Sequence, residues 1–131
     1  MTKIALGVVA GLVTWFLVAT AGNLAFRFGW PGYAGVEATM AFSPAMMLAR
    51  LALGAVSSSC SGAVAARIAK QRIGAVWVLG IVLIGLFIPV HYRLWQAFPL
   101  WYHAVFLVSL LPLTLFGAWA FTCARAPAAP R

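Results

Sequence analysis

Two histidines are the first of the few residues in this chain that could do chemistry. His91 and His103 are the only imidazoles among its 131 residues. Two imidazoles at the same depth on neighbouring helices could ligate a haem b iron axially, bind copper or hold a quinone headgroup. No carboxylate lies near them in sequence to orient such ligands. The sequence therefore favours two hydrogen-bonded histidines at a membrane surface over a metal site.

Arg50 is the second candidate, because it is a charged residue within an apolar segment. The only acidic residue, Glu37, lies thirteen positions upstream, which is about 20 Å along a continuous helix. A direct pair requires the intervening loop to fold back. Otherwise Arg50 extends toward the membrane surface, or bonds to Asn23 or to carbonyls freed by Pro112. An intramembrane cation is a candidate for ligand binding or for a transport pathway.

Glu37 has nearer options than Arg50. It could favour the positive end of the next helix dipole, or meet Arg27 or Arg93 at the surface. Six aromatic residues of the two outer loops are typical of an interfacial belt: Trp30, Tyr33, Tyr92, Trp95, Trp101 and Tyr102. The candidate ligand-binding residues are predicted to share one face of the membrane: Arg50, Glu37, His91, His103, Arg93 and Trp95.

Nucleophilic catalysis finds little support in the sequence. Ser58 belongs to a run of serines with Cys60, but it lies about 22 Å below the end of its helix where the histidines are expected. Phosphate-binding loops, dinucleotide fingerprints and zinc-protease motifs do not occur. No catalytic residue is assigned, and an enzyme is the less favoured interpretation.

The elements that must position these residues are four long apolar segments. The chain is 65% hydrophobic, well above the roughly 45–50% of soluble domains. Residues 4–26, 42–66, 73–90 and 101–124 each approach the roughly 20 residues that a helix needs to cross a bilayer. The sequence predicts an all-α, integral membrane four-helix bundle that forms one domain over residues 1–131.

Local sequence suggests where some of these helices begin and end. Ser43 can cap a helix whose first residue is Pro44. Pro89 is expected to end the third helix, and Pro112 to kink the fourth. The first segment also fits a cleavable signal peptide with Ala19-Thr20-Ala21 as its cleavage site, which would leave three helices with the same orientation.

The basic residues predict an orientation. With four spans, the two termini and the loop between the second and third segments share one side, which carries Lys3, Arg67, Lys70, Arg72, Arg125 and Arg131. The opposite side carries two, Arg27 and Arg93. The positive-inside rule then places both termini in the cytoplasm, in a bacterial inner membrane. The formal net charge of +8 is distributed between apolar segments, which excludes a nucleic-acid binder and leaves lipid headgroups as its partners.

Small residues mark the faces on which helices can pack closely. Gly54, Ser58 and Gly62 recur every four positions along the second segment. The first segment offers Gly7 and Gly11 in the spacing of a close helix contact. We expect these five residues to carry helix packing within the bundle.

The aromatic and proline pattern resembles a family of small uncharacterised bacterial four-helix inner-membrane proteins. The residues that carry the resemblance span most of the chain: Trp30-Pro31-Gly32-Tyr33, Glu37, Met46 to Arg50, Pro89-Val90-His91, Leu94-Trp95, Phe98-Pro99 and Trp101-Tyr102-His103. The resemblance implies a four-helix membrane protein, and it implies no activity or site. The small multidrug exporters fit less well, because their first helix carries a glutamate that is missing here.

Three functions remain open on the sequence. The leading one is a non-enzymatic accessory or assembly subunit that binds a lipid or small ligand at its outer face, as a homo-oligomer or with a partner in a membrane complex, without a cofactor. The second is a redox anchor that binds haem b or a quinone through His91 and His103. The third is a small oligomeric transporter with Arg50 in its pathway.

Overall fold

The computed structural model describes residues 2–125, and every regular element in that range is a helix. Four of the helices are long and apolar enough to cross a membrane, which confirms the four predicted segments and indicates a multi-pass membrane protein. The elements in chain order are α1 (Thr2–Gly29), α2 (Tyr33–Thr39), α3 (Pro44–Ile68), α4 (Ile73–Arg93) and α5 (Leu100–Arg125).

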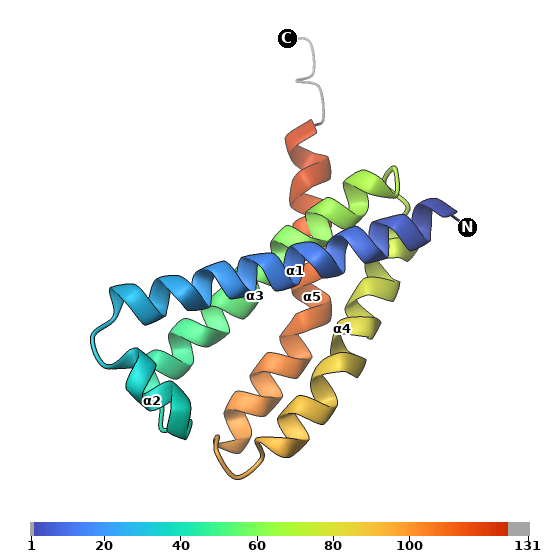
Figure 1. The fold of residues 1–131 in the computed structure, drawn as a ribbon. Helices are drawn as coiled ribbons and strands as arrows, with labels where there is room; N and C mark the ends of the chain where they lie inside the picture. Colours follow the sequence, from blue (N-terminus) through green and yellow to red (C-terminus); the bar gives the residue numbers. More distant parts are fainter. Residues whose placement is uncertain (1, 126–131) are drawn as a thin grey trace.

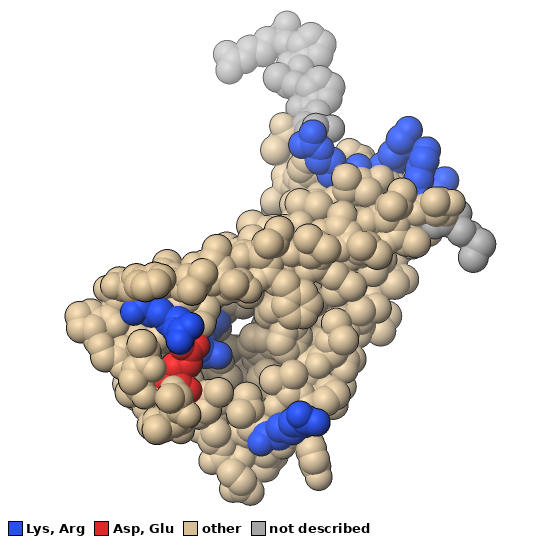
Figure 2. All heavy atoms as spheres, in the orientation of Figure 1, with Lys and Arg blue, Asp and Glu red and all other residues tan. Residues whose placement is uncertain are grey.

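Helix α3 lies at the centre of the arrangement. It packs against α1, α4 and α5, while the short α2 contacts α1. The start of α1, the turn between α3 and α4 and the end of α5 lie at one end of the molecule, here called the terminal end (Figure 1). The loop between α4 and α5 lies at the opposite end with α2, here called the α2 end. Basic side chains gather at the terminal end (Figure 2).

Glycines bring the backbones of α3 and α5 into contact. A Cβ atom at Gly62 would overlap the backbone of Thr114, and one at Gly117 would overlap the backbone of Ser59. Helices without side-chain atoms between them can approach this closely, which strengthens van der Waals packing where lipid supplies little hydrophobic drive. The α3–α5 crossing is therefore intolerant of even one added carbon.

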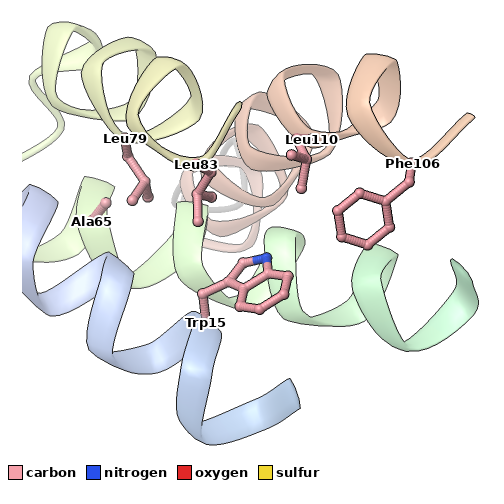
Figure 3. Close-up of a cluster of buried hydrophobic side chains, with 6 residues drawn as sticks. All are labelled: Trp15, Ala65, Leu79, Leu83, Phe106 and Leu110. Carbon is pink, nitrogen blue, oxygen red and sulfur yellow. The ribbon is translucent and has the colours of Figure 1, made fainter. Parts of the chain in front are cut away.

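The other small residues expected to pack also lie between helices. A Cβ at Gly7 would be 2.9 Å from the carbonyl oxygen of Ala65, and one at Gly11 would meet Leu79. A Cβ at Gly54 would be 3.1 Å from the ring of Phe106. Between these contacts lies an apolar core to which α1, α3, α4 and α5 all contribute (Figure 3): Trp15, Ala65, Leu79, Leu83, Phe106 and Leu110.

Large apolar side chains also cover the outside of the bundle. Leu17 is 64% exposed, Val108 73% and Trp119 59%. Such exposure is unfavourable in water and expected where a helix faces lipid chains. The distribution agrees with the hydropathy of the four long helices.

Two details of the predicted helices need correction. Pro89 does not end the third helix, because α4 continues to Arg93 with Pro89 inside it. The segment between the first two spans was expected to be a loop, but it contains α2. The predicted cap at the start of the second span is confirmed: the Ser43 hydroxyl accepts a hydrogen bond from the Met46 amide (3.3 Å), and Pro44 is the first helical residue.

Candidate functional site

Helix α2 closes the α2 end of the bundle by folding back on α1. Gly32 precedes it with φ of +81°, a backbone conformation that glycine adopts without the steric cost of a Cβ. This turn places Tyr33 in full burial among aromatic neighbours, with its ring centroid 5.5 Å from that of Phe26 and 5.4 Å from that of Phe42. Tyr33 thereby fixes α2 over the polar residues of α1 and α3.

Arg50 of α3 is held by neutral groups. Its Nη1 donates to the Tyr33 hydroxyl at 2.8 Å and to Asn23 Oδ1 at 3.4 Å. The guanidinium carbon lies 4.6 Å from the centre of the Phe42 ring, within the range of a cation–π contact. The Tyr102 hydroxyl lies near the same guanidinium. Arg50 is therefore oriented inside the bundle, and among the described residues it has no direct contact with a carboxylate.

Glu37 is joined to this group through Asn23. Asn23 Nδ2 donates to Glu37 Oε1 at 2.7 Å, and the Tyr33 hydroxyl donates to Asn23 Oδ1 at 2.9 Å. The second carboxylate oxygen, Oε2, pairs with Nε of Arg27 at 2.9 Å. The loop does fold back, as a direct Arg50–Glu37 pair would have required, but the carboxylate goes to Arg27 and reaches Arg50 only through a neutral amide.

A cavity of about 340 Å³ opens beside this polar group. Its polar lining comes from Asn23, Arg27, Arg50, His91 and Tyr102. Figure 2 shows a hollow in the surface next to the acidic group and its basic neighbours. The rest of the lining is mostly apolar and aromatic, from α1, α3, α4, α5 and the loop between α4 and α5: Trp15, Ala19, Leu24, Leu53, Phe87, Val90, Leu94, Phe98 and Phe106, with Thr20 and Gly54.

The two histidines are buried and bonded to each other. His91 Nδ1 and His103 Nδ1 lie 2.7 Å apart, so one ring donates its proton and the other accepts it. Nitrogens on opposite sides of one metal ion lie roughly 4 Å apart, at about 2 Å per bond. The two Nδ1 atoms are closer than that, so as placed they cannot be the two axial ligands of one iron. His103 Nε2 is buried and has no hydrogen-bond partner within residues 2–125.

The structure brings together only some of the predicted site residues. Arg50 and His91 line the cavity. Glu37 and His103 do not line it, but each bonds to a lining residue, Glu37 to Asn23 and His103 to His91. Arg93 ends α4 in an exposed position and does not line the cavity. Trp95 is half exposed and stacks on His103, with ring centroids 5.0 Å apart. Arg93 and Trp95 thus lie outside the candidate site.

Tyr33 and Tyr102 are the site residues that sequence reasoning missed. Both were assigned to the interfacial aromatic belt, yet both are buried, and their hydroxyls point to a polar interior. Tyr33 follows Pro31-Gly32, a turn signal that predicts a reversal of the chain. That signal could have indicated that Tyr33 returns to the bundle. Nothing in the sequence distinguishes Tyr102 from its neighbour Trp101.

Comparison of the chain with protein-family models, with curated proteins and with solved structures finds no match.

Proposed function

We propose that this chain is a non-enzymatic subunit of the bacterial inner membrane that binds a lipid or another amphipathic small molecule in the cavity at its α2 end. The observation that carries the proposal is the composition of that cavity, which joins a fixed guanidinium to an aromatic and aliphatic lining. Ligand sites are typically concave and mostly apolar, with a few convergent polar groups. An amphiphile meets both requirements with one molecule.

The orientation proposed with this function has both termini in the cytoplasm. The support is the charge distribution: the terminal end carries Lys3, the basic turn after α3 and Arg125, whereas the α2 end carries fewer basic residues. Positive charge is retained on the cytoplasmic side of bacterial membrane proteins. Arg131, which also entered the count, lies outside the described residues. The cavity would then open toward the periplasmic half of the bilayer.

Retention of a ligand tests the cavity directly. The full chain is purified in a mild non-ionic detergent and analysed by native mass spectrometry for a stoichiometric bound amphiphile. The variant Ala19→Leu adds bulk to the cavity lining and should lose it, whereas Ala52→Leu, at an exposed position of the same bundle outside the lining, should keep it. Equal retention in both variants would place the ligand elsewhere and contradict the proposal.

Cysteine labelling tests the orientation. In a background with Cys60 and Cys123 replaced by serine, single cysteines are placed at Lys70, in the turn between α3 and α4, and at Gln96, in the loop between α4 and α5. A maleimide that does not cross the inner membrane should label the Gln96→Cys protein in intact spheroplasts and the Lys70→Cys protein only after lysis. The reverse pattern would overturn the orientation.

The subunit role requires an assembly. Crosslinking in intact cells, followed by size analysis in a mild detergent, should give a defined higher-mass species, either a homo-oligomer or a complex with another membrane protein. A chain that remains monomeric in both measurements would contradict that part of the proposal and leave ligand binding to stand alone.

A further inference from the structure

The charge balance of the polar group leaves Arg50 without an anion. Glu37 is the only acidic side chain in the 131-residue sequence. One of its oxygens pairs with Arg27 at 2.9 Å and the other accepts from Asn23. Arg50 therefore has no side-chain carboxylate left to pair with anywhere in the chain, and its guanidinium stays charged because arginine does not deprotonate in proteins.

The groups around Arg50 do not replace that anion. Tyr33 and Asn23 offer neutral oxygens to Nη1, and the Phe42 ring covers the guanidinium carbon. Arg50 Nε is buried and has no hydrogen-bond partner among the described residues. Charged residues within membrane spans are costly unless they pair or reach water, and buried charges generally require an opposite charge close by. Neutral partners orient Arg50 and leave its charge uncompensated.

The route by which Arg50 could reach the membrane surface is occupied. A long basic side chain in a membrane helix usually extends to the interface. Here Tyr33 is fully buried and bonded to the guanidinium, and Phe42 lies against it. These residues belong to α2 and to the segment that follows it, so they hold the side chain at the wall of the cavity.

We infer that the missing counter-ion of Arg50 is the anionic group of the cavity's ligand. This inference rests on the proposed ligand-binding function and specifies its ligand class: an amphiphile with a carboxylate or phosphate group and a hydrocarbon chain. The anionic group lies against Arg50, and the chain lies among Phe87, Leu94, Phe106 and the other apolar lining residues. Carboxylate and phosphate oxygens are the acceptors that a guanidinium binds most strongly.

The remaining polar lining agrees with one negative charge. Arg27 is already neutralised by Glu37, and the cavity lining contains no acidic residue that would repel an anion. His91 lines the same cavity and bonds to His103 through Nδ1 only. The described residues therefore present the ligand with one uncompensated cation, Arg50, and neutral donors beside it.

A series of three ten-carbon amphiphiles tests the inference. The full chain in dodecyl maltoside is titrated with decanoate, decyl phosphate and decanol, and thermal unfolding reports binding. Decanoate and decyl phosphate should raise the unfolding midpoint at concentrations at least tenfold below those that decanol requires. Arg50→Gln should remove this preference, whereas Arg93→Gln, an exposed arginine outside the cavity, should retain it. Should Arg50→Gln fail to fold, Arg50→Lys keeps the charge and should keep the preference.

The outcomes separate the two proposals. Three results would overturn the inference while ligand binding stands. The first is equal stabilisation by decanol and the two anions. The others are a preference for the anions that persists in a folded Arg50→Gln protein, and a loss of that preference in Arg50→Lys. No stabilisation by any of the three would overturn the proposed function itself. Protein reconstituted in nanodiscs of phosphatidylglycerol and phosphatidylcholine then identifies the source: enrichment of phosphatidylglycerol on the purified chain indicates a lipid headgroup, and its absence indicates a free carboxylate or phosphate amphiphile.

Discussion

The two halves of α3 use small residues for opposite purposes. In the half toward the terminal end, Gly62 meets the backbone of Thr114, and Ser57 and Ser61 bond to carbonyls of their own helix. In the half toward the α2 end, Gly54 meets only the ring of Phe106 and lines the cavity. The first half is in backbone contact with α5, whereas the second half borders the cavity beside the charged Arg50.

This difference indicates where the molecule tolerates substitutions. Close packing in a membrane bundle depends on van der Waals contact that one carbon can disrupt. The polar half depends instead on a few hydrogen bonds around Arg50, which can be removed one at a time. Substitutions in the two halves should therefore differ in size and in what they affect.

The largest effect is expected at the α3–α5 crossing. Gly62→Ala places a Cβ on the backbone of Thr114, so the helices must separate. We expect a loss of about 3 kcal/mol in the free energy of unfolding, the upper part of the range for overpacking. Gly85→Ala is the matched control, because Gly85 of α4 has open space around it and alanine is the better helix former. Reversible unfolding in detergent measures both, and equal stability of the two variants would contradict the backbone contact at the α3–α5 crossing.

A smaller effect is expected at Tyr33. Tyr33→Phe removes the hydroxyl that joins Arg50 to Asn23 and leaves both without that partner. An unpaired buried polar group costs about 1–3 kcal/mol, so we expect about 2 kcal/mol of destabilisation and weaker ligand retention. Tyr92→Phe, at a position that is 81% exposed, should change neither. A Tyr33→Phe protein with wild-type stability would mean that this hydroxyl does not organise the polar half.

A smaller loss of stability is expected from a substitution at the boundary between the two halves of α3. Trp15 Nε1 donates to the Ser58 hydroxyl at 3.1 Å, and both residues are buried. Ser58→Ala leaves the indole N–H unpaired, at a cost of about 1 kcal/mol. Ser59→Ala has the same gain in helix propensity and removes no side-chain hydrogen bond among those of the described residues. The difference between these two unfolding free energies measures the contribution of the Trp15–Ser58 hydrogen bond. A difference near zero would show that this bond does not stabilise the protein.

The smallest effect is expected at Glu37. Its partner Arg27 is 49% exposed, and ion pairs with that much exposure contribute below about 1 kcal/mol. Glu37→Gln should therefore change the unfolding free energy only slightly. It also leaves Arg27 without its carboxylate, so the cavity gains an uncompensated cation and should bind decanoate more tightly. Weaker decanoate binding would contradict the charge balance on which the inference about Arg50 rests.

The helices were more predictable than the site, for a physical reason. Apolar segments of about 20 residues leave few alternatives to helices, because backbone groups in lipid must be satisfied internally. The prediction that Pro89 ends the third helix was wrong, because neighbouring helices allow proline inside a membrane helix. The role of Tyr33 depends on the turn at Gly32, and the partner of Gly62 depends on the angle at which α5 crosses α3. Such tertiary contacts leave little trace in local sequence.

Photolabelling tests the central claim, that the cavity takes an anionic amphiphile, most directly. The full chain in native membranes is irradiated with a diazirine-bearing decanoate, and the labelled residues are identified by peptide mapping. The account predicts labels on the cavity lining, at Phe87, Phe106 or Leu24, that excess unlabelled decanoate suppresses and that are lost in Arg50→Gln. Labels confined to lipid-facing residues such as Leu17 and Val108, unaffected by competitor, would contradict it.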